Sequence, residues 1–141
     1  MMKIDTSFYL RCIQTLEMAH GKVQQHDVDS VEFELFRSAC VKEFEIILEQ
    51  SGKLLRKCLA PYFHSSHAVK KLVFKDLFRY AAQHGLIEIE QTERWLTYRD
   101  HRNSTAHDYG REFADKTLKL LEQFIVDAKA LETVMRECDH D

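Results

Sequence analysis

DSVEFELFRSACVKEFEIILEQSGKLLRKCL, residues 29–59, carries apolar side chains three and four positions apart along its whole length. That spacing places them on one face of an α-helix, so we predict a single helix of about 30 residues. Asp29 and Glu32 have the spacing of a capping box at its start, and Pro61 limits its end. We expect Gly52 to mark a close crossing with another element. The apolar stripe consists of Leu35, Phe36, Ala39, Cys40, Phe44, Ile47, Leu48, Leu54, Leu55 and Cys58.

Similar patterns lie on both sides of this long helix. Apolar spacing predicts helices over residues 7–25, 90–101 and 112–136, and a shorter helix that contains residues 69–81 and ends at Gly85. The stretch YFHSSHAV, residues 62–69, is predicted to be a loop. With only four glycines and one proline in 141 residues, the fold class is all-α, an antiparallel bundle of about five helices in a single domain, residues 1–141. The expected core positions of the first and last helices are Tyr9, Ile13, Leu16 and Val23, and Ala114, Leu118, Leu121, Ile125, Ala128 and Leu131.

The cysteines and the N-terminus indicate the compartment. The four cysteines are scattered, with no CxxC pair and no histidine at zinc spacing, so we expect reduced thiols and no metal or cofactor. The N-terminus lacks the apolar stretch of a signal peptide, and no segment has the uninterrupted apolar length that spans a bilayer. These features predict a cytoplasmic protein that does not associate with membranes. The four cysteines are Cys12, Cys40, Cys58 and Cys138.

Positive charge is concentrated in the middle of a chain whose net charge is −3. Residues 53–79, which we call the basic segment, hold seven basic side chains and one acidic one. Such a segment attracts polyanions, but it equally fits a solvated helix face beside acidic neighbours or an acidic partner. The candidates for RNA binding within it are Lys70, Lys71, Lys75 and Arg79, and its other basic residues are Lys53, Arg56 and Lys57.

RDHRNSTAHDYG, residues 99–110, combines side chains suited to proton transfer and to phosphate binding. In RNA cleavage the 2′-hydroxyl loses a proton, the leaving 5′-oxygen gains one, and negative charge builds on the phosphate. Histidine, present here as His107, is the side chain type whose ordinary pKa lies near neutral pH, and Arg102 can donate two N–H groups to one phosphate. We expect His101 to be a solvated helix residue.

Structural roles account for the same side chains. Arg102 can pair with Asp100 or Glu93, and Asn103 can cap a helix. His107 can bond a backbone carbonyl in a partly buried site, and Tyr109 can pack on the core. The spacing alone favours these structural roles over catalysis.

The motif in its context resembles the HEPN superfamily, in the branch of the nucleotidyltransferase substrate-binding proteins and the related HepT toxins of the MntA/HepT toxin–antitoxin system. R-x4-H-x-Y follows a helix that bears Trp95, as in that branch. FEIILEQSGKLLRKCL (residues 44–59) is similar to the long second helix of the family, and FKDLFRYAAQHGLI (residues 74–87) to the segment before the motif helix. The resemblance covers residues 8–135. The sequence departs from the family at Gln50-Ser51-Gly52, which leaves the local packing of the long helix open.

The resemblance implies a function and a set of partners. Arg102 and His107 of two protomers would form a composite, metal-independent endoribonuclease site at a homodimer interface, and Asn103 would support it. Tyr109 would be AMPylated by a minimal nucleotidyltransferase, which silences the nuclease. The alternative is a non-catalytic substrate-binding subunit of a two-component nucleotidyltransferase. The apolar residues offered to a second chain would be Phe8, Phe33, Phe78 and Trp95, although core packing accounts for them as well.

Overall fold

The computed structural model describes residues 2–103 and 110–140 and confirms the all-α class. Its elements in chain order are β1 (Met2–Lys3), α1 (Ser7–Val23), α2 (Val31–Leu59), the 3-10 turn η1 (Ala60–Tyr62), α3 (Ser66–Lys70), α4 (Phe74–Gln83), α5 (Ile89–Asn103), α6 (Arg111–Arg136) and β2 (Asp139–His140). The two short strands pair in antiparallel register, with Met2 opposite His140. Within the described ranges there are thus six α-helices rather than about five, and the short α3 is the addition.

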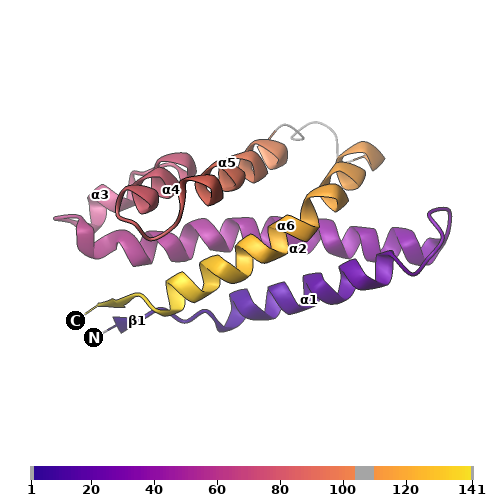
Figure 1. Cartoon of the computed structure of the whole chain (residues 1–141), viewed down its shortest axis with the longest axis horizontal. Coiled ribbons are helices and arrows are strands. Elements are labelled where there is room, and N and C mark those ends of the chain that lie inside the picture. Colours follow the sequence, from indigo (N-terminus) through magenta and orange to yellow (C-terminus); the bar gives the residue numbers. More distant parts are fainter. Residues whose placement is uncertain (1, 104–109, 141) are drawn as a thin grey trace.

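The long helix α2 is the axis around which the other helices pack (Figure 1). Helix α1 runs antiparallel along one side of it, and α6 crosses both. Helices α3, α4 and α5 lie on the opposite side, over the C-terminal half of α2. Both chain termini lie at the same end of the molecule, where β1 and β2 pair.

The start of α2 is set by a serine rather than by the predicted capping box. Ser30 is the N-cap, and its Oγ accepts a hydrogen bond from the backbone N–H of Phe33 at 3.1 Å. The cap therefore lies one residue after Asp29. The sequence offers both residues as caps, and only the backbone geometry at residue 30 distinguishes them.

Helix α2 continues without interruption through Ser51 and Gly52, where the sequence departs from the family. The Ser51 hydroxyl is buried, donates to the carbonyl of Ile47 at 2.7 Å and lies 2.8 Å from the hydroxyl of Tyr9 on α1. A Cβ on Gly52 would lie 3.1 Å from the ring of Phe74 at the start of α4. This contact confirms that Gly52 marks a close crossing.

The segment between α2 and α4 is more ordered than the predicted loop. Ser65 caps α3 by accepting a hydrogen bond from the N–H of Ala68 at 3.1 Å. The prediction of a loop over residues 62–69 is therefore wrong for its second half. Gly85 follows the end of α4 with a φ of +73°, which confirms its predicted role because this left-handed conformation favours glycine.

The core is an aromatic cluster where α2, α4, α5 and α6 meet. The rings of Phe78 and Trp95 stack 5.2 Å apart, and Phe124 packs against Trp95 and Phe44. Phe78 and Trp95 are fully buried, so neither is available to a second chain, whereas Phe8 is exposed.

Two predicted core stripes shift at their first turns. On α6 the buried residues near the start are Phe113 and Thr117, whereas Ala114 and Leu118 are only partly buried. On α2 Leu35 is exposed rather than buried. The remaining core positions predicted for α1 and α6 are buried.

The expectation of four reduced cysteines is correct for two of them. Cys12 and Cys40 are buried free thiols, and burial raises the pKa of Cys40 to about 11. Cys58 near the end of α2 and Cys138 after α6 instead form a disulfide across 80 residues of sequence. The ends of these two helices are neighbours only in the folded chain, so spacing along the sequence gave no sign of the pair.

Candidate functional site

Helix α5 carries the first half of the R-x4-H-x-Y motif and is held to α6 by a buried carboxylate. Asp127 accepts two hydrogen bonds from Arg94, each of 2.8 Å, and one of 2.5 Å from the Tyr98 hydroxyl. Asp127 is 2% exposed, so this carboxylate is satisfied by protein donors rather than by water. The network fixes the rotation of α5 about its axis and its position along α6. The direction in which the last turn of α5 presents its side chains is thereby set.

Arg102 lies on that last turn and is partly exposed. Its Nε is 3.9 Å from Glu45 on α2. Among the ion pairs of the described residues, Arg102 pairs with neither of the predicted partners, Asp100 and Glu93, and Asp100 pairs with Lys75. Asn103 is the exposed final residue of α5. His107 and Tyr109 lie outside the described residues.

Arg99, which the sequence analysis did not single out, lies one turn before Arg102. Its guanidinium sits over the ring of Phe74, 5.1 Å from the ring centroid. Burial, and secondarily the charge of Arg102, lower the pKa of Arg99, while Glu49 acts in the opposite direction. The three-residue spacing from Arg102 is visible in the sequence, but the contact with Phe74 depends on the packing of α4 on α5.

His101 is packed between helices and is not the solvated residue that we predicted. Its ring stacks on Phe113 at 4.6 Å and meets the edge of Phe44 at 5.9 Å. Its Nε2 is 2.8 Å from the hydroxyl of Thr117, which itself donates to the carbonyl of Phe113. Because that donation uses the hydroxyl proton, we infer that Nε2–H of His101 is the donor to Thr117. Burial, and secondarily Lys116, lower the pKa of His101.

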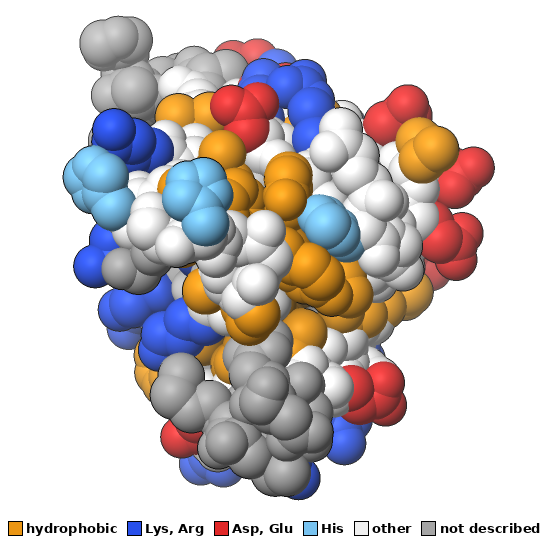
Figure 2. Space-filling model, turned by 90° about the vertical axis from the view of Figure 1, so that its left-hand side faces the viewer, with side chains coloured by type: hydrophobic (Ala, Val, Ile, Leu, Met, Phe, Trp, Pro, Cys, Tyr) orange, Lys and Arg blue, Asp and Glu red, His pale blue; other side chains and the backbone are white. Residues whose placement is uncertain are grey.

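The four candidates for RNA binding in the basic segment separate into two pairs. Lys75 is 2.6 Å from Asp100, and Arg79 is 3.6 Å from Asp76, so both take part in ion pairs on the surface. Lys70 and Lys71 are exposed and line a cavity beside Arg99. Figure 2 shows the end of the molecule around α3, where Lys and Arg side chains gather on one flank and acidic side chains on the other.

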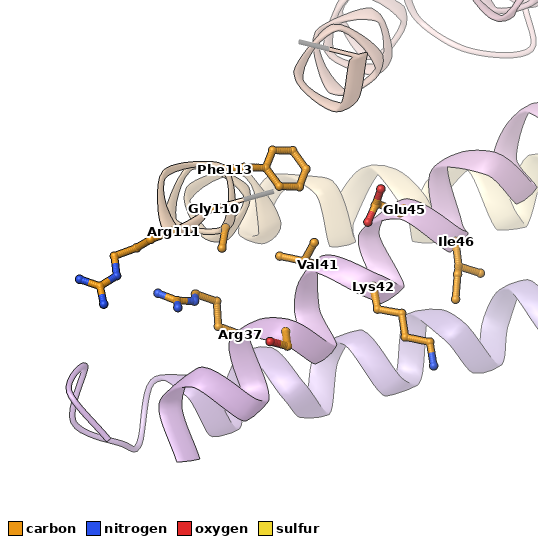
Figure 3. Close-up of a pocket in the computed structure, with 10 residues that line it drawn as sticks. Arg37, Val41, Lys42, Glu45, Ile46, Gly110, Arg111 and Phe113 are labelled. Atoms are coloured by element: carbon orange, nitrogen blue, oxygen red, sulfur yellow. The ribbon is translucent and has the colours of Figure 1, made fainter. Parts of the chain in front are cut away.

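A groove of about 610 Å³, lined in part by Glu45, lies between α2 and the start of α6 (Figure 3). Val41 from α2 and Phe113 from α6 contribute apolar surface to its lining, while Arg37 and Arg111 extend toward the same side. Arg37 is 3.2 Å from Asp115, so part of this positive charge is compensated. Glu45, the ion-pair partner of Arg102, lines this groove, whereas Arg99, one turn before Arg102, lines the basic cavity.

The described residues offer neither a metal site nor a membrane span. They hold no group of three or more histidine, cysteine, aspartate or glutamate side chains that could bind a metal ion. None of the helices in the described ranges has the length and apolar character needed to cross a membrane.

Comparison with known proteins identifies the family. The sequence profile described as "Nucleotidyltransferase substrate binding protein like" matches residues 5–137. The chain belongs to this family. It is also 28% identical over 100 residues to "Probable ribonuclease HepT" of Haemophilus influenzae, a match that covers 71% of this chain and 67% of that protein. The resemblance seen in the sequence to the HepT-type branch of the HEPN superfamily is thereby confirmed.

A solved structure confirms the fold. The structure of HI0074 from Haemophilus influenzae, described as revealing the fold of a substrate-binding domain of a nucleotidyltransferase, superposes with a TM-score of 0.79. The superposition covers 94% of this chain and 100% of that chain, at 22% identity. At this identity the likeness concerns the fold alone.

Proposed function

We propose that this protein is a metal-independent endoribonuclease, the toxin of a toxin–antitoxin pair. The active site is composite, with Arg102 and His107 contributed by each protomer of a homodimer. The observation that carries the proposal is the position of Arg102, which is partly exposed on the last turn of a helix whose body is clamped by Asp127. His107 follows five residues later in the sequence. The name of the relative, a probable ribonuclease, supports the same chemistry.

The reaction uses only the side chains of the chain and the RNA itself. One His107 takes the proton of the ribose 2′-hydroxyl, whose oxygen attacks the adjacent phosphorus. The bond to the 5′-oxygen breaks, and the second His107 gives that oxygen a proton. Arg102 donates hydrogen bonds to the phosphate oxygens, on which negative charge increases in the transition state. The products are a 2′,3′-cyclic phosphate and a free 5′-hydroxyl.

The remaining motif residues have supporting roles in this proposal. Asn103 stabilises the chain next to Arg102 or the bound RNA. Tyr109 is AMPylated from ATP by a partner, a minimal nucleotidyltransferase that acts as the antitoxin. An added AMP places a phosphate and a bulky nucleoside two residues from His107, which repels the RNA backbone. The family description supports a nucleotidyltransferase as the partner.

The same description also favours a second candidate function. In it the protein is a non-catalytic subunit that presents a substrate to the nucleotidyltransferase, and the Arg102 region binds the phosphate of that substrate. The two candidates differ in one respect. Only the ribonuclease requires His107 for the breakage of RNA.

Cleavage of RNA by matched variants tests the proposal. Labelled tRNA is incubated with unmodified protein in EDTA, beside Arg102→Ala and His107→Ala, and the ends of the products are analysed. Arg11→Ala and His20→Ala are the controls, because both residues lie on α1, away from the motif. We expect cyclic phosphate ends from the wild-type protein and both controls, and no cleavage by the two motif variants. Absence of RNA cleavage by all five proteins, with Tyr109 shown by mass spectrometry to be unmodified, would favour the substrate-presenting subunit.

A further inference from the structure

A basic cavity beside α2 is lined by Arg99, one helical turn before Arg102, and no part of the proposed reaction uses it. The cavity has a volume of about 530 Å³. Its charged lining consists of one acidic residue, Glu49, and five basic ones, Lys53, Arg56, Lys70, Lys71 and Arg99. The rest of the lining is Gly52, Leu72, Val73 and Phe74. The excess of positive charge in so small a volume favours an anionic ligand.

Most of this charge is not compensated by carboxylates. Among the ion pairs formed by described residues, none involves Lys53, Lys70 or Arg99. Arg56 is bound by the backbone rather than by a carboxylate, since it donates hydrogen bonds to the carbonyls of Val69 and Leu72. Those bonds hold the guanidinium at the cavity without neutralising it. A guanidinium has five N–H donors, so some remain for a ligand.

Arg99 is oriented by an aromatic ring rather than by an acid. The ring of Phe74 lies under its guanidinium, and Gly52 lets that ring approach α2 to within the distance at which a Cβ would crowd it. A cation–π contact orients the arginine and leaves its charge available. Two arginines, Arg99 and Arg102, thus stand one helical turn apart, and the charge of each opposes that of the other. An anion bound between them relieves this repulsion.

The cavity and the Arg102 position lie along one face of α2. Glu45, Glu49, Gly52 and Arg56 recur every three or four residues, so they share that face. Glu45 contacts Arg102, and the other three line the cavity. From Glu45 to Arg56 the helix rises on the order of 16 Å, which is more than one nucleotide of an extended strand. A strand cleaved at Arg102 can therefore continue along α2 into the cavity.

We propose that this cavity binds the phosphodiester backbone of the single-stranded RNA next to the cleavage site, with Arg99, Lys70 and Lys71 as the phosphate ligands. The identity of the strand as RNA rests on the proposed function. Phe74 is the positioning residue for Arg99. Lys75 and Arg79 are not part of this site, because Asp100 and Asp76 occupy their charges.

Binding of RNA that cannot be cleaved tests the site separately from catalysis. The probe is a fluorescein-labelled single strand of about 12 nucleotides with 2′-O-methyl riboses, which lack the attacking hydroxyl. Fluorescence anisotropy gives the Kd of the full-length protein at a series of salt concentrations. The variants are Arg99→Gln, Arg99→Lys and the double variant Lys70→Gln/Lys71→Gln, with Arg11→Gln as the charge-matched control on α1. Circular dichroism confirms that each variant is folded.

We expect Arg99→Gln and the lysine double variant each to raise the Kd about tenfold, and Arg11→Gln to leave it unchanged. The slope of log Kd against log salt should fall by about 0.7 for each phosphate contact removed. Arg99→Lys should restore part of the affinity, because it keeps the charge. A purely structural role of Arg99 would change the melting temperature but not the salt slope.

Three results would overturn the proposal. The first is a Kd that neither Arg99→Gln nor the double variant changes, even if Arg102→Ala still abolishes cleavage of ordinary RNA. The second is a rise in the Kd for the RNA probe that is as large in Arg11→Gln as in Arg99→Gln. The third is binding of ATP or inorganic phosphate that depends on Arg99 while RNA binding does not. If instead Arg99 governs RNA binding but His107→Ala cleaves normally, the proposed ribonuclease site fails and this binding site stands.

Discussion

Replacing Asp127 by asparagine tests whether the buried carboxylate fixes the motif helix. The substitution keeps the size of the side chain but removes its charge and replaces one acceptor oxygen by a donor. Tyr98 is 2% exposed and donates to this carboxylate at 2.5 Å. A hydrogen bond to a charged group contributes about 1.5–3 kcal/mol. The Arg94 side chain is 37% exposed, so water partly replaces its lost partner and its share is about 1 kcal/mol or less.

The sum predicts a loss of about 3 kcal/mol in the free energy of unfolding, measured by urea titration with circular dichroism. For a chain of this length the melting temperature should fall by roughly 6–12 °C. The matched control is Asp115→Asn, the same substitution on the same helix, where the carboxylate is 47% exposed in its ion pair with Arg37. It should cost no more than about 0.5 kcal/mol.

A double-mutant cycle separates the Tyr98 contact from the rest of the network. Tyr98→Phe combined with Asp127→Asn should show a coupling energy of about 1 kcal/mol or more. If Asp127→Asn is no more destabilising than Asp115→Asn, or if the cycle gives no coupling, the argument that Asp127 clamps α5 to α6 is refuted.

Three further predictions follow from other contacts. Burial lowers the pKa of His101, so the imidazole binds a proton more tightly in the unfolded chain than in the folded one. The free energy of unfolding should therefore fall as the pH drops through about 6.5. In urea titrations at a series of pH values, His101→Gln should reduce that dependence. Gly52→Val should cost about 1–3 kcal/mol by the same titration, because the added methyl groups press on Phe74; an unchanged midpoint would contradict the close crossing. The disulfide between Cys58 and Cys138 closes a loop of 80 residues, so Cys138→Ser should lower the free energy of unfolding by about 2–5 kcal/mol without reductant and have no effect with reductant. Equal effects in both buffers would contradict the disulfide.

The sequence predicted those parts of the fold that depend on one repeating spacing. The long helix α2, the stripe of α1 and most of the stripe of α6 follow from apolar residues three and four positions apart, and burial confirms them. Two of the failures depend on single hydrogen bonds. Ser30 rather than Asp29 caps α2, and Ser65 nucleates α3 inside a predicted loop, because any of several polar residues can cap a helix and the backbone selects one of them.

The motif can be recognised in the sequence, and the roles of its residues stay predictions; the surroundings of the motif cannot be recognised there. The spacing of the motif singles out Arg102, His107 and Tyr109, of which only Arg102 lies among the described residues. Arg99 and His101 were missed or misassigned because their environments come from Phe74 on α4 and Phe113 on α6. Contacts of this kind join residues far apart in the sequence, so a pattern read along one segment does not contain them.

The rate of RNA cleavage by His107→Ala relative to the wild-type protein is the most direct test of the central claim. The measurement uses one labelled tRNA, EDTA in the buffer, and protein whose Tyr109 is unmodified by mass. Loss of a general acid or base slows a reaction by about 10²–10⁴-fold, so the variant should be slower by at least a factor of about 100. A His107→Ala protein that cleaves the RNA at the wild-type rate would contradict the proposed ribonuclease.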